Sequence, residues 1–382
     1  MKIPASLPAL AALAVAFGAA PAAAADDTIK VGALLAVTGP AAFLGAPEAR
    51  TLEMLVEQLN AKGGVAGRKI QLIVKDTAGS PEKAVSFAKQ LLEEEQVFAI
   101  IGPATSGETM QVKGLAEQAK TPLLSCAAAE AIVNPVARYV FKTAQKDSHA
   151  IAHVFTQMKK MGATKIGVLS SNTGFGQAGK ALIAKLAPEH GIQIVIEETY
   201  DKAATDLTAE VTKLKAANVQ ALLNWSIEPA QSIVIKNARQ IGLKVPIFQS
   251  HGFANIGYVK GAGAAAEGVI FPASAIIVAE SLPAKHPQKK VLVDYKKAYE
   301  AKYKEDASAF GAYAFDAFGL LVKAIQAAGT DRDKVRDALE ATTGWVGASG
   351  VFNMSAADHN GLGMDAFELV TVKGGKFVPL GK

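Results

Sequence analysis

The feature that most constrains the fold of this chain is a regular alternation of short apolar strands with helices, which begins at Thr28. In the first third of the chain we expect strands at residues 29–35, 70–75, 97–101 and 123–125, separated by helices at 47–59, from 80 onward, and at 107–119. Ser80-Pro81 indicates a helix start, because Ser is a favoured N-cap and Pro suits the first helical position. Strands separated by helices of this length predict βαβ units and a parallel sheet.

The same alternation begins again after residue 146. Here we expect strands at 165–170, 192–199, 221–225 and 245–248, and helices at 149–161, 177–187, 207–214 and 230–241. The last part is less regular, with expected helices at 286–303, 312–328 and 334–341 and a strand at 367–372. The pattern predicts two similar α/β lobes, each a parallel-type sheet flanked by helices, with a first boundary near Thr143–Lys146. No Pro- or Ser-rich linker separates them, so we expect several chain crossings that act as a hinge.

The N-terminus indicates export from the cytoplasm. Lys2 is followed by an apolar stretch from Leu7 to Ala20 and by small residues at Ala23-Ala24-Ala25. This is the pattern of a secretory signal peptide over residues 1–25, cleaved near Ala25. The apolar stretch is short for a membrane span, and no later segment is long and uncharged enough to cross a bilayer. We expect a secreted, soluble protein.

Composition excludes several classes of function. The 40 basic residues are spread among 35 acidic ones, for a net charge of +5. This distribution is typical of a solvated surface and not of a basic patch that binds nucleic acid. The basic cluster Lys285–Lys290 has no interleaved aromatic residues, so we interpret it as a helix entry. Cys126 is the single cysteine, so no intramolecular disulfide forms. We expect no nucleic-acid partner and no cofactor.

Three features are typical of enzymes or metal sites, and we favour a structural interpretation of each. Gly174–Gly179 (GFGQAG) matches the dinucleotide fingerprint, but Ser171-Asn172-Thr173 separate it from the preceding strand, and an exported protein meets little nicotinamide cofactor. His149 and His153 have a metal-binding spacing but no evident third ligand. Cys126 follows a strand with no histidine placed beside it. We predict neither enzymatic activity nor a metal site.

Two small-residue turns at strand ends carry the functional prediction. Thr105-Ser106-Gly107 opens a helix after the strand at 97–101, and Ser106 can cap that helix beside exposed N–H groups that favour an anion. Ser125–Ala129 forms a second small-residue turn after the next strand. Because ligands bind at the carboxyl ends of strands in open α/β sheets, the two turns together predict a carboxylate site built largely from backbone donors.

The chain resembles the periplasmic binding proteins of branched-chain amino-acid ABC importers over essentially its whole mature length. The matching segments are Ile29–Pro40, Asn60–Gly64, Ile100–Ser106, Ala238–Leu243 and Ala266–Gly268. The resemblance implies a two-lobe fold with three crossings that closes on its ligand in the periplasm. It places residues 26–146 and 275–350 in an N-terminal lobe, and 147–274 and 351–382 in a C-terminal lobe.

The family's ligand contacts carry over unevenly. Ser106, next to Thr105, matches the serine that holds the ligand carboxylate, and Ala127 matches a backbone contact. Ala129 replaces a threonine of the family. Phe175 and Ile227 stand where tyrosines are expected, and His251 occupies the position of the acidic residue that pairs with the amino acid's ammonium.

The change at His251 decides the expected ligand class. A buried ammonium needs a compensating charge, and imidazole does not supply one. The residues expected to bind the ligand carboxylate are therefore kept, whereas the acidic partner of the ammonium is missing. The expected apolar walls for a flat ring are Phe43, Phe175, Trp225 and Phe253. Our hypothesis is an aromatic or apolar monocarboxylate, with His251 bonded to a distal hydroxyl or carbonyl.

The expected mechanism is capture followed by closure. The ligand docks on Ser106 and the neighbouring amides, and the second lobe closes with Phe175, Trp225 and His251. We expect a monomer that docks on a membrane permease. Three alternatives stay open: an amino-acid binder that uses Glu228 or Glu108 for the ammonium, a sensory binding module, and a periplasmic enzyme.

Overall fold

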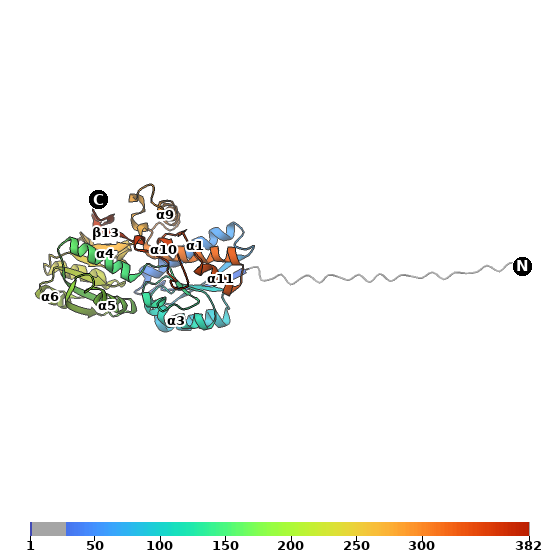
Figure 1. The fold of residues 1–382 in the computed structure, drawn as a ribbon, viewed down its shortest axis with the longest axis horizontal. Coiled ribbons are helices and arrows are strands. Elements are labelled where there is room, and N and C mark those ends of the chain that lie inside the picture. The colour runs from blue at the N-terminus through green and yellow to red at the C-terminus, as the bar shows by residue number, and fades with distance from the viewer. Residues whose placement is uncertain (2–27, 382) are drawn as a thin grey trace.

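The computed structural model describes Met1 and residues 28–381; residues 2–27 and 382 lie outside the described part, and with them the expected signal peptide and its cleavage site. The described chain forms two separate β-sheets and a small two-stranded sheet. Figure 1 shows α4, α5 and α6 around one large sheet at one end of the molecule, and α1, α3 and α11 around the other.

The first sheet is entirely parallel and has the strand order β2-β1-β3-β4-β5. Its strands are β1 (Thr28–Leu35), β2 (Lys69–Asp76), β3 (Ala99–Ile101), β4 (Leu123–Ser125) and β5 (Val140–Lys142). The helices that pack on it are α1 (Ala42–Ala61), α2 (Pro81–Lys89), α3 (Ser106–Gln118) and α10 (Ala309–Ala328), and α11 (Arg332–Glu340) packs on α10. We call this sheet and these helices the first lobe.

Alternating side chains of the first sheet enter two different cores. Ala33 and Ile101 belong to the core that α1 and α10 cover, whereas Leu34 and Ile100 belong to the core under α2 and α3. This alternation follows from the two-residue period of a strand. Because both faces are apolar, the first sheet is covered by helices on both sides, as parallel sheets generally are.

The second sheet is mixed and has the order β14-β13-β10-β9-β8-β6-β7. Its strands are β6 (Lys165–Ser171), β7 (Gln193–Tyr200), β8 (Ala221–Trp225), β9 (Ile247–Gln249), β10 (Ile270–Ala273), β13 (Glu368–Lys373) and β14 (Lys376–Pro379). The last two are antiparallel additions at one edge. The helices of this second lobe are α4 (Asp147–Lys160), α5 (Gly174–Leu186), α6 (Thr208–Ala216), α7 (Ala230–Gln240) and α8 (Ile256–Ala262).

The chain passes between the two sheets three times, as expected. The first passage joins β5 to α4, the second leads from β10 to α10 by way of α9 (Lys289–Tyr303), and the third leads to β13. The small sheet of β11 (Trp345–Val346) and β12 (Val351–Phe352) precedes the third passage. Since β12 pairs with β11 and the Met354 N–H donates to the Thr342 carbonyl, we propose that residues 351–360 belong to the first lobe and that the third crossing comes later than Gly350.

Polar contacts tie the passages together. The Gln145 amide in the first passage donates to the carbonyls of Ser349 and Ala366, at 2.8 and 3.2 Å. The buried Asp316 carboxylate of α10 accepts from the N–H groups of Ala348 and Ser349, at 2.6 and 2.7 Å. Lys146 pairs with Asp358 at 2.8 Å. The segments between the lobes are therefore fixed to one another by hydrogen bonds.

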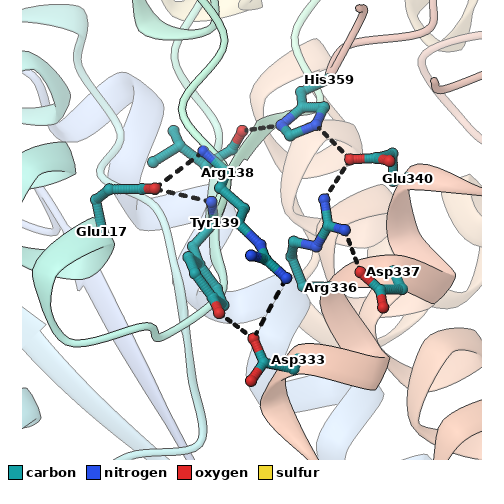
Figure 2. A network of polar contacts seen from close by, with 9 residues as sticks. Glu117, Arg138, Tyr139, Asp333, Arg336, Asp337, Glu340 and His359 are labelled. Atoms are coloured by element: carbon teal, nitrogen blue, oxygen red, sulfur yellow. Dashed lines mark hydrogen bonds and ion pairs between the residues drawn. The ribbon is translucent and has the colours of Figure 1, made fainter. Parts of the chain in front are cut away.

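A further network joins α11 to the edge of the first sheet (Figure 2). The buried His359 ring lies between two oxygen atoms: Nδ1 is 2.8 Å from the Val140 carbonyl, and Nε2 is 3.2 Å from the Glu340 carboxylate. Arg336 bonds the same Glu340. The His359 ring also stacks on Phe141 at 4.2 Å. The segment that leads into the third passage is thus held against β5, the strand that leads into the first.

The expected helices and strands correspond to observed ones apart from their ends, but the sequence pattern missed α8 and five strands: β5, β10, β11, β12 and β14. The missed elements are two to seven residues long, and periodicity alone does not assign such short segments reliably. No described helix is both long and apolar enough to cross a bilayer.

Candidate functional site

The N-terminus of α3 is capped by Thr105, and not by Ser106 as expected. The Thr105 side chain accepts from the Glu108 N–H at 3.3 Å and donates to the Glu108 carboxyl at 2.6 Å. The T-x-x-E spacing is the signature of a capping arrangement. Ser106 becomes the first helical residue, so its hydroxyl is released from capping.

The Ser106 hydroxyl instead faces the second strand-end turn. Its oxygen accepts from the Ala129 N–H at 3.2 Å, which leaves the hydroxyl proton for another partner. The Ala127 N–H donates to the Ser125 hydroxyl at 3.1 Å. The N–H of Ala128 donates no hydrogen bond among the described residues. The donors left for a ligand are therefore the Ser106 hydroxyl and the backbone of Ala128.

Ser106 and Ala128 line a small cavity between the two lobes, which we call the inner cavity. Its lining residues are Leu44, Ala104, Ser106, Cys126, Ala127, Ala128, Phe175, Ile227, His251, Gly252, Phe310 and Tyr313. Its volume is about 20 Å³, which is room for about one water molecule. Both lobes contribute, so the size of the cavity depends on how closely they approach.

His251 enters the inner cavity from the second lobe, at the end of β9. It is 2% exposed, and the rings of Phe175, Trp225 and Phe367 pack edge-on against it with centroids 5.5–5.7 Å away. Neither ring nitrogen has a hydrogen-bond partner among the described residues. Burial, together with the charge of Lys142, lowers the pKa of His251 to about 3. The imidazole is neutral at physiological pH and offers one donor and one acceptor.

An acidic residue that the sequence did not single out lies beside His251. Asp147, at the start of α4, is 1% exposed, and its Oδ1 is 3.5 Å from Nε2 of His251. The distance is long for a hydrogen bond, and Oδ1 has no other partner within the described chain. Burial raises the pKa of Asp147 to about 7, and the nearby Lys142 opposes that shift. Asp147 lies in the first passage and not in a strand-end motif, so the sequence pattern gave no reason to place it at the site.

Tyr313 and Phe310 of α10 also line the inner cavity, and the sequence analysis missed both. The Tyr313 hydroxyl is buried and lacks a hydrogen-bond partner in the described part of the chain. An unpaired buried hydroxyl is costly, so its position favours a ligand group that can bond to it. The Ala309–Ala328 helix is apolar almost throughout, and only the fold decides which of its faces lines a cavity.

The structure brings some of the expected aromatic residues to the inner cavity and not others. Phe175 lines it. Trp225 lies behind Phe175, with ring centroids 5.6 Å apart and planes 23° apart, and so supports the wall without facing the cavity. Phe43 packs on Tyr258 at the rim between the lobes, and Phe253 is buried between Tyr258 and Phe271. Neither Phe43 nor Phe253 is among the cavity-lining residues.

A second, larger space of about 340 Å³, the outer chamber, lies beside the inner cavity and shares Phe175 and Ile227 with it. Thr105 and Glu228 line this chamber. The Glu228 carboxylate accepts from the Ser226 hydroxyl at 2.7 Å and from the Ile227 N–H at 3.2 Å. Glu228 therefore faces the chamber and not the inner cavity.

The glycines of the GFGQAG motif allow close approach within the protein. A Cβ on Gly176 would come within 2.0 Å of the Ser171 carbonyl, and one on Gly179 within 2.0 Å of the Trp225 indole nitrogen. A Cβ on Gly174 would come within 2.7 Å of Gly107 in the first lobe. Each glycine thus has a packing role, which explains the motif without a nucleotide.

Two further buried carboxyls lie near the site but do not line it. Both oxygens of Glu48 on α1 lack hydrogen-bond partners within the described residues. Burial and the proximity of Glu108 raise its pKa well above the ordinary value, and burial likewise raises the pKa of Glu108. The raised pKa of each group disfavours its charged form, and neither carboxyl lines the inner cavity.

Two sheets joined by three passages, with a cavity between the lobes at the strand ends, define a bilobal solute-binding protein. Residues 28–376 match the periplasmic binding protein family, and the chain belongs to that family. The chain is 28% identical over 340 residues to the leucine-, isoleucine-, valine-, threonine- and alanine-binding protein of Pseudomonas aeruginosa, covering 87% of each chain. The resemblance to proteins of the Leu/Ile/Val-binding type is thus confirmed, and these relatives are binding proteins and not enzymes.

Solved structures agree with this assignment. An extracellular ligand-binding receptor from Rhodopseudomonas palustris HaA2 superposes with a TM-score of 0.86 at 29% identity, covering 92% of this chain and 99% of the receptor. A solute-binding protein of an ABC transporter from Rhodopseudomonas palustris BisB5, solved with 3,4-dihydroxybenzoic acid, has a TM-score of 0.78 at 20% identity, covering 92% and 96% of the two chains. The second likeness shows a shared fold.

Proposed function

We propose that this protein is the exported, monomeric solute-binding component of an ABC importer, and that it captures a small monocarboxylic acid with an aromatic or apolar body. The observation that carries the proposal is the pairing, in one cavity, of the free Ser106 hydroxyl from the first lobe with a neutral His251 from the second. The hydroxyl donates to a carboxylate oxygen. The uncharged imidazole suits a hydroxyl or carbonyl at another position of the ligand.

The charges around the inner cavity support a ligand without an ammonium group. A buried ammonium needs an ionised partner. His251 stands where the family resemblance places the acidic residue, and it is neutral. Phe175, Phe310 and Leu44 add apolar surface, which suits a ring or a branched aliphatic chain.

Capture requires the lobes to move. A volume of about 20 Å³ is smaller than any organic acid of this class, so the ligand enters when the lobes part and holds them together through contacts with both. A ligand stabilises one arrangement only through contacts that the other arrangement lacks. The three passages are the segments about which the lobes would rotate. The liganded form then docks on the permease.

One observation favours a second candidate, an amino acid with a relocated ammonium site. The unpartnered Oδ1 of Asp147 lies 3.5 Å from His251, and an ammonium beside it would lower the pKa of Asp147 and ionise it. The relative from Pseudomonas aeruginosa is named for five amino acids. This candidate places Asp147, and neither Glu228 nor Glu108, as the ammonium partner.

A thermal-shift panel distinguishes the two candidates. The probes are 4-hydroxybenzoate, benzoate and isovalerate as ammonium-free acids, L-leucine and L-alanine as amino acids, and benzamide as a ring without a carboxylate. Stabilisation by the acids and not by benzamide supports the first candidate. Stabilisation by the amino acids alone would replace it with the second, and Asp147→Asn should then abolish the effect.

A further inference from the structure

Lys142, the last residue of β5, is a lysine with no solvent exposure that lies beneath the candidate carboxylate site. Its ammonium group donates to three backbone carbonyls: Ala128 at 2.8 Å, Ala144 at 2.8 Å and Gln145 at 2.9 Å. A lysine has three N–H donors, so all are used. Burying an ammonium is costly even with such partners, and an ordinary packing role would be filled by an apolar side chain.

One of these three carbonyls connects Lys142 to the ligand donor. The Ala128 carbonyl and the Ala129 N–H belong to the same peptide group. Lys142 bonds the carbonyl at 2.8 Å, and the N–H donates to Ser106 at 3.2 Å. The hydrogen bonds run in one direction, from the ammonium through the peptide to the Ser106 hydroxyl. Chains of this kind polarise each member, which strengthens the last donor.

The inference rests on the proposed carboxylate-binding function. We propose that Lys142 is a positioning residue that supplies the positive charge for the ligand carboxylate, acting through the Ala128–Ala129 peptide and the Ser106 hydroxyl without touching the ligand. Lys142 would supply a positive charge that the site otherwise lacks, since the residues that line the inner cavity include no cationic side chain. A carboxylate taken out of water needs such a charge nearby.

Other charged groups face Lys142 from every element around it. Asp147 of α4, Glu130 beside the ligand turn and Asp358 in the segment before the third passage favour its charged form, whereas Lys146 opposes it. His251 across the cavity is neutral. Burial outweighs these contributions and lowers the pKa of Lys142 to about 8. In the free protein the ammonium therefore begins to lose its proton just above physiological pH.

This arrangement predicts proton uptake on binding. A bound carboxylate favours the charged ammonium and raises its pKa, so that ligand binding takes up a proton near pH 8 and almost none from Lys142 at pH 6. Affinity should be constant below the free-state pKa and fall by up to about tenfold per pH unit above it. Asp147 is buried beside Lys142 and titrates together with it, so a variant of Lys142 is needed to assign the proton uptake to one of the two groups.

The test is isothermal titration calorimetry of the full mature chain with 4-hydroxybenzoate, or with L-leucine if that acid does not bind, at pH 6.0 to 9.0. Two buffers of different ionisation enthalpy at each pH measure the proton uptake. Wild type should take up protons near pH 8. Lys142→Arg, which keeps the charge, should bind without that uptake and hold its affinity to pH 9.

Two further variants complete the design. Lys142→Met should weaken binding at pH 6.5 by about a hundredfold or more and give a flat pH profile. Lys160→Met, a charge loss at the exposed end of α4, is the control and should behave like wild type. If Lys142→Met does not fold, wild type and Lys142→Arg still decide the question.

Binding by wild type with no proton uptake near pH 8, or uptake that persists in Lys142→Arg, would overturn the inference about Lys142 alone. Failure of both probes to bind wild type would remove the proposed function and this inference with it.

Discussion

Gly107 of α3 and Gly174 of α5 lie against each other across the junction of the two lobes, near the N-termini of their helices. A methyl group on Gly174 would lie 2.7 Å from the Gly107 Cα and 2.9 Å from its nitrogen, whereas one on Gly107 would meet nothing nearer than 3.8 Å. The contact is therefore asymmetric. The close approach of the lobes depends on the missing side chain of Gly174.

This asymmetry predicts different effects for two similar substitutions. Gly174→Ala should hold the lobes apart and cost about 2 kcal/mol of binding free energy, or roughly thirtyfold in affinity. Gly107→Ala is the matched control and should bind almost as wild type does. Calorimetric affinities and the radius of gyration of the liganded protein measure both effects. Equal affinities for the two variants would show that this contact does not limit closure.

His251 should determine which ligands enter. His251→Glu places a carboxylate near Asp147 and the ligand, and should weaken 4-hydroxybenzoate binding by roughly tenfold to a hundredfold. His251→Gln keeps one donor and one acceptor and should lose much less. The pKa of His251 is lowered to about 3, so its titration should not affect binding between pH 5 and 8. Unchanged affinity in His251→Glu would place His251 outside the ligand site.

The packing of Gly179 beneath Trp225 should be important for stability. A Cβ at Gly179 would lie 2.0 Å from the indole nitrogen, so Gly179→Ala should lower the free energy of unfolding by about 1–3 kcal/mol. Gly114 is an exposed glycine within α3 with no atom near its Cβ position. Gly114→Ala should instead add about 0.5–1 kcal/mol. Urea denaturation of both variants tests the contrast, and a neutral Gly179→Ala would contradict the close contact.

Asp316 should make stability depend on pH. Burial raises its pKa to about 7 in the folded protein, although it accepts hydrogen bonds from Ala348 and Ser349. The folded state then binds more protons than the unfolded state between about pH 4 and 7, so stability should decrease as pH rises through this range and level off above it.

Asp316→Asn should lose that part of the pH dependence. The measurement is the difference in free energy of unfolding between wild type and variant at several pH values from 4 to 8. The difference should change across this range even if the variant is less stable throughout. A constant difference would mean that Asp316 is ionised in the folded protein over the whole range.

The alternation of strands and helices, the two lobes and the family resemblance followed from the sequence. They did so because hydrophobic periodicity is local: Ile29–Leu35 or Leu123–Ser125 can be recognised as a strand from neighbouring residues alone. The turns at Thr105–Gly107 and Ser125–Ala129 were likewise recognisable, since both follow apolar strands.

Only the tertiary structure decided how these pieces form a site. It assigned the cap to Thr105 and released Ser106, brought Tyr313 to the inner cavity, and placed Phe43 and Phe253 elsewhere. It also set Asp147 beside a neutral His251. Asp147 and His251 are more than a hundred positions apart in the sequence, and the charge state of a buried group depends on its surroundings in space. Sequence alone therefore determined the class of protein, and the packing of the two lobes determined which groups meet a ligand.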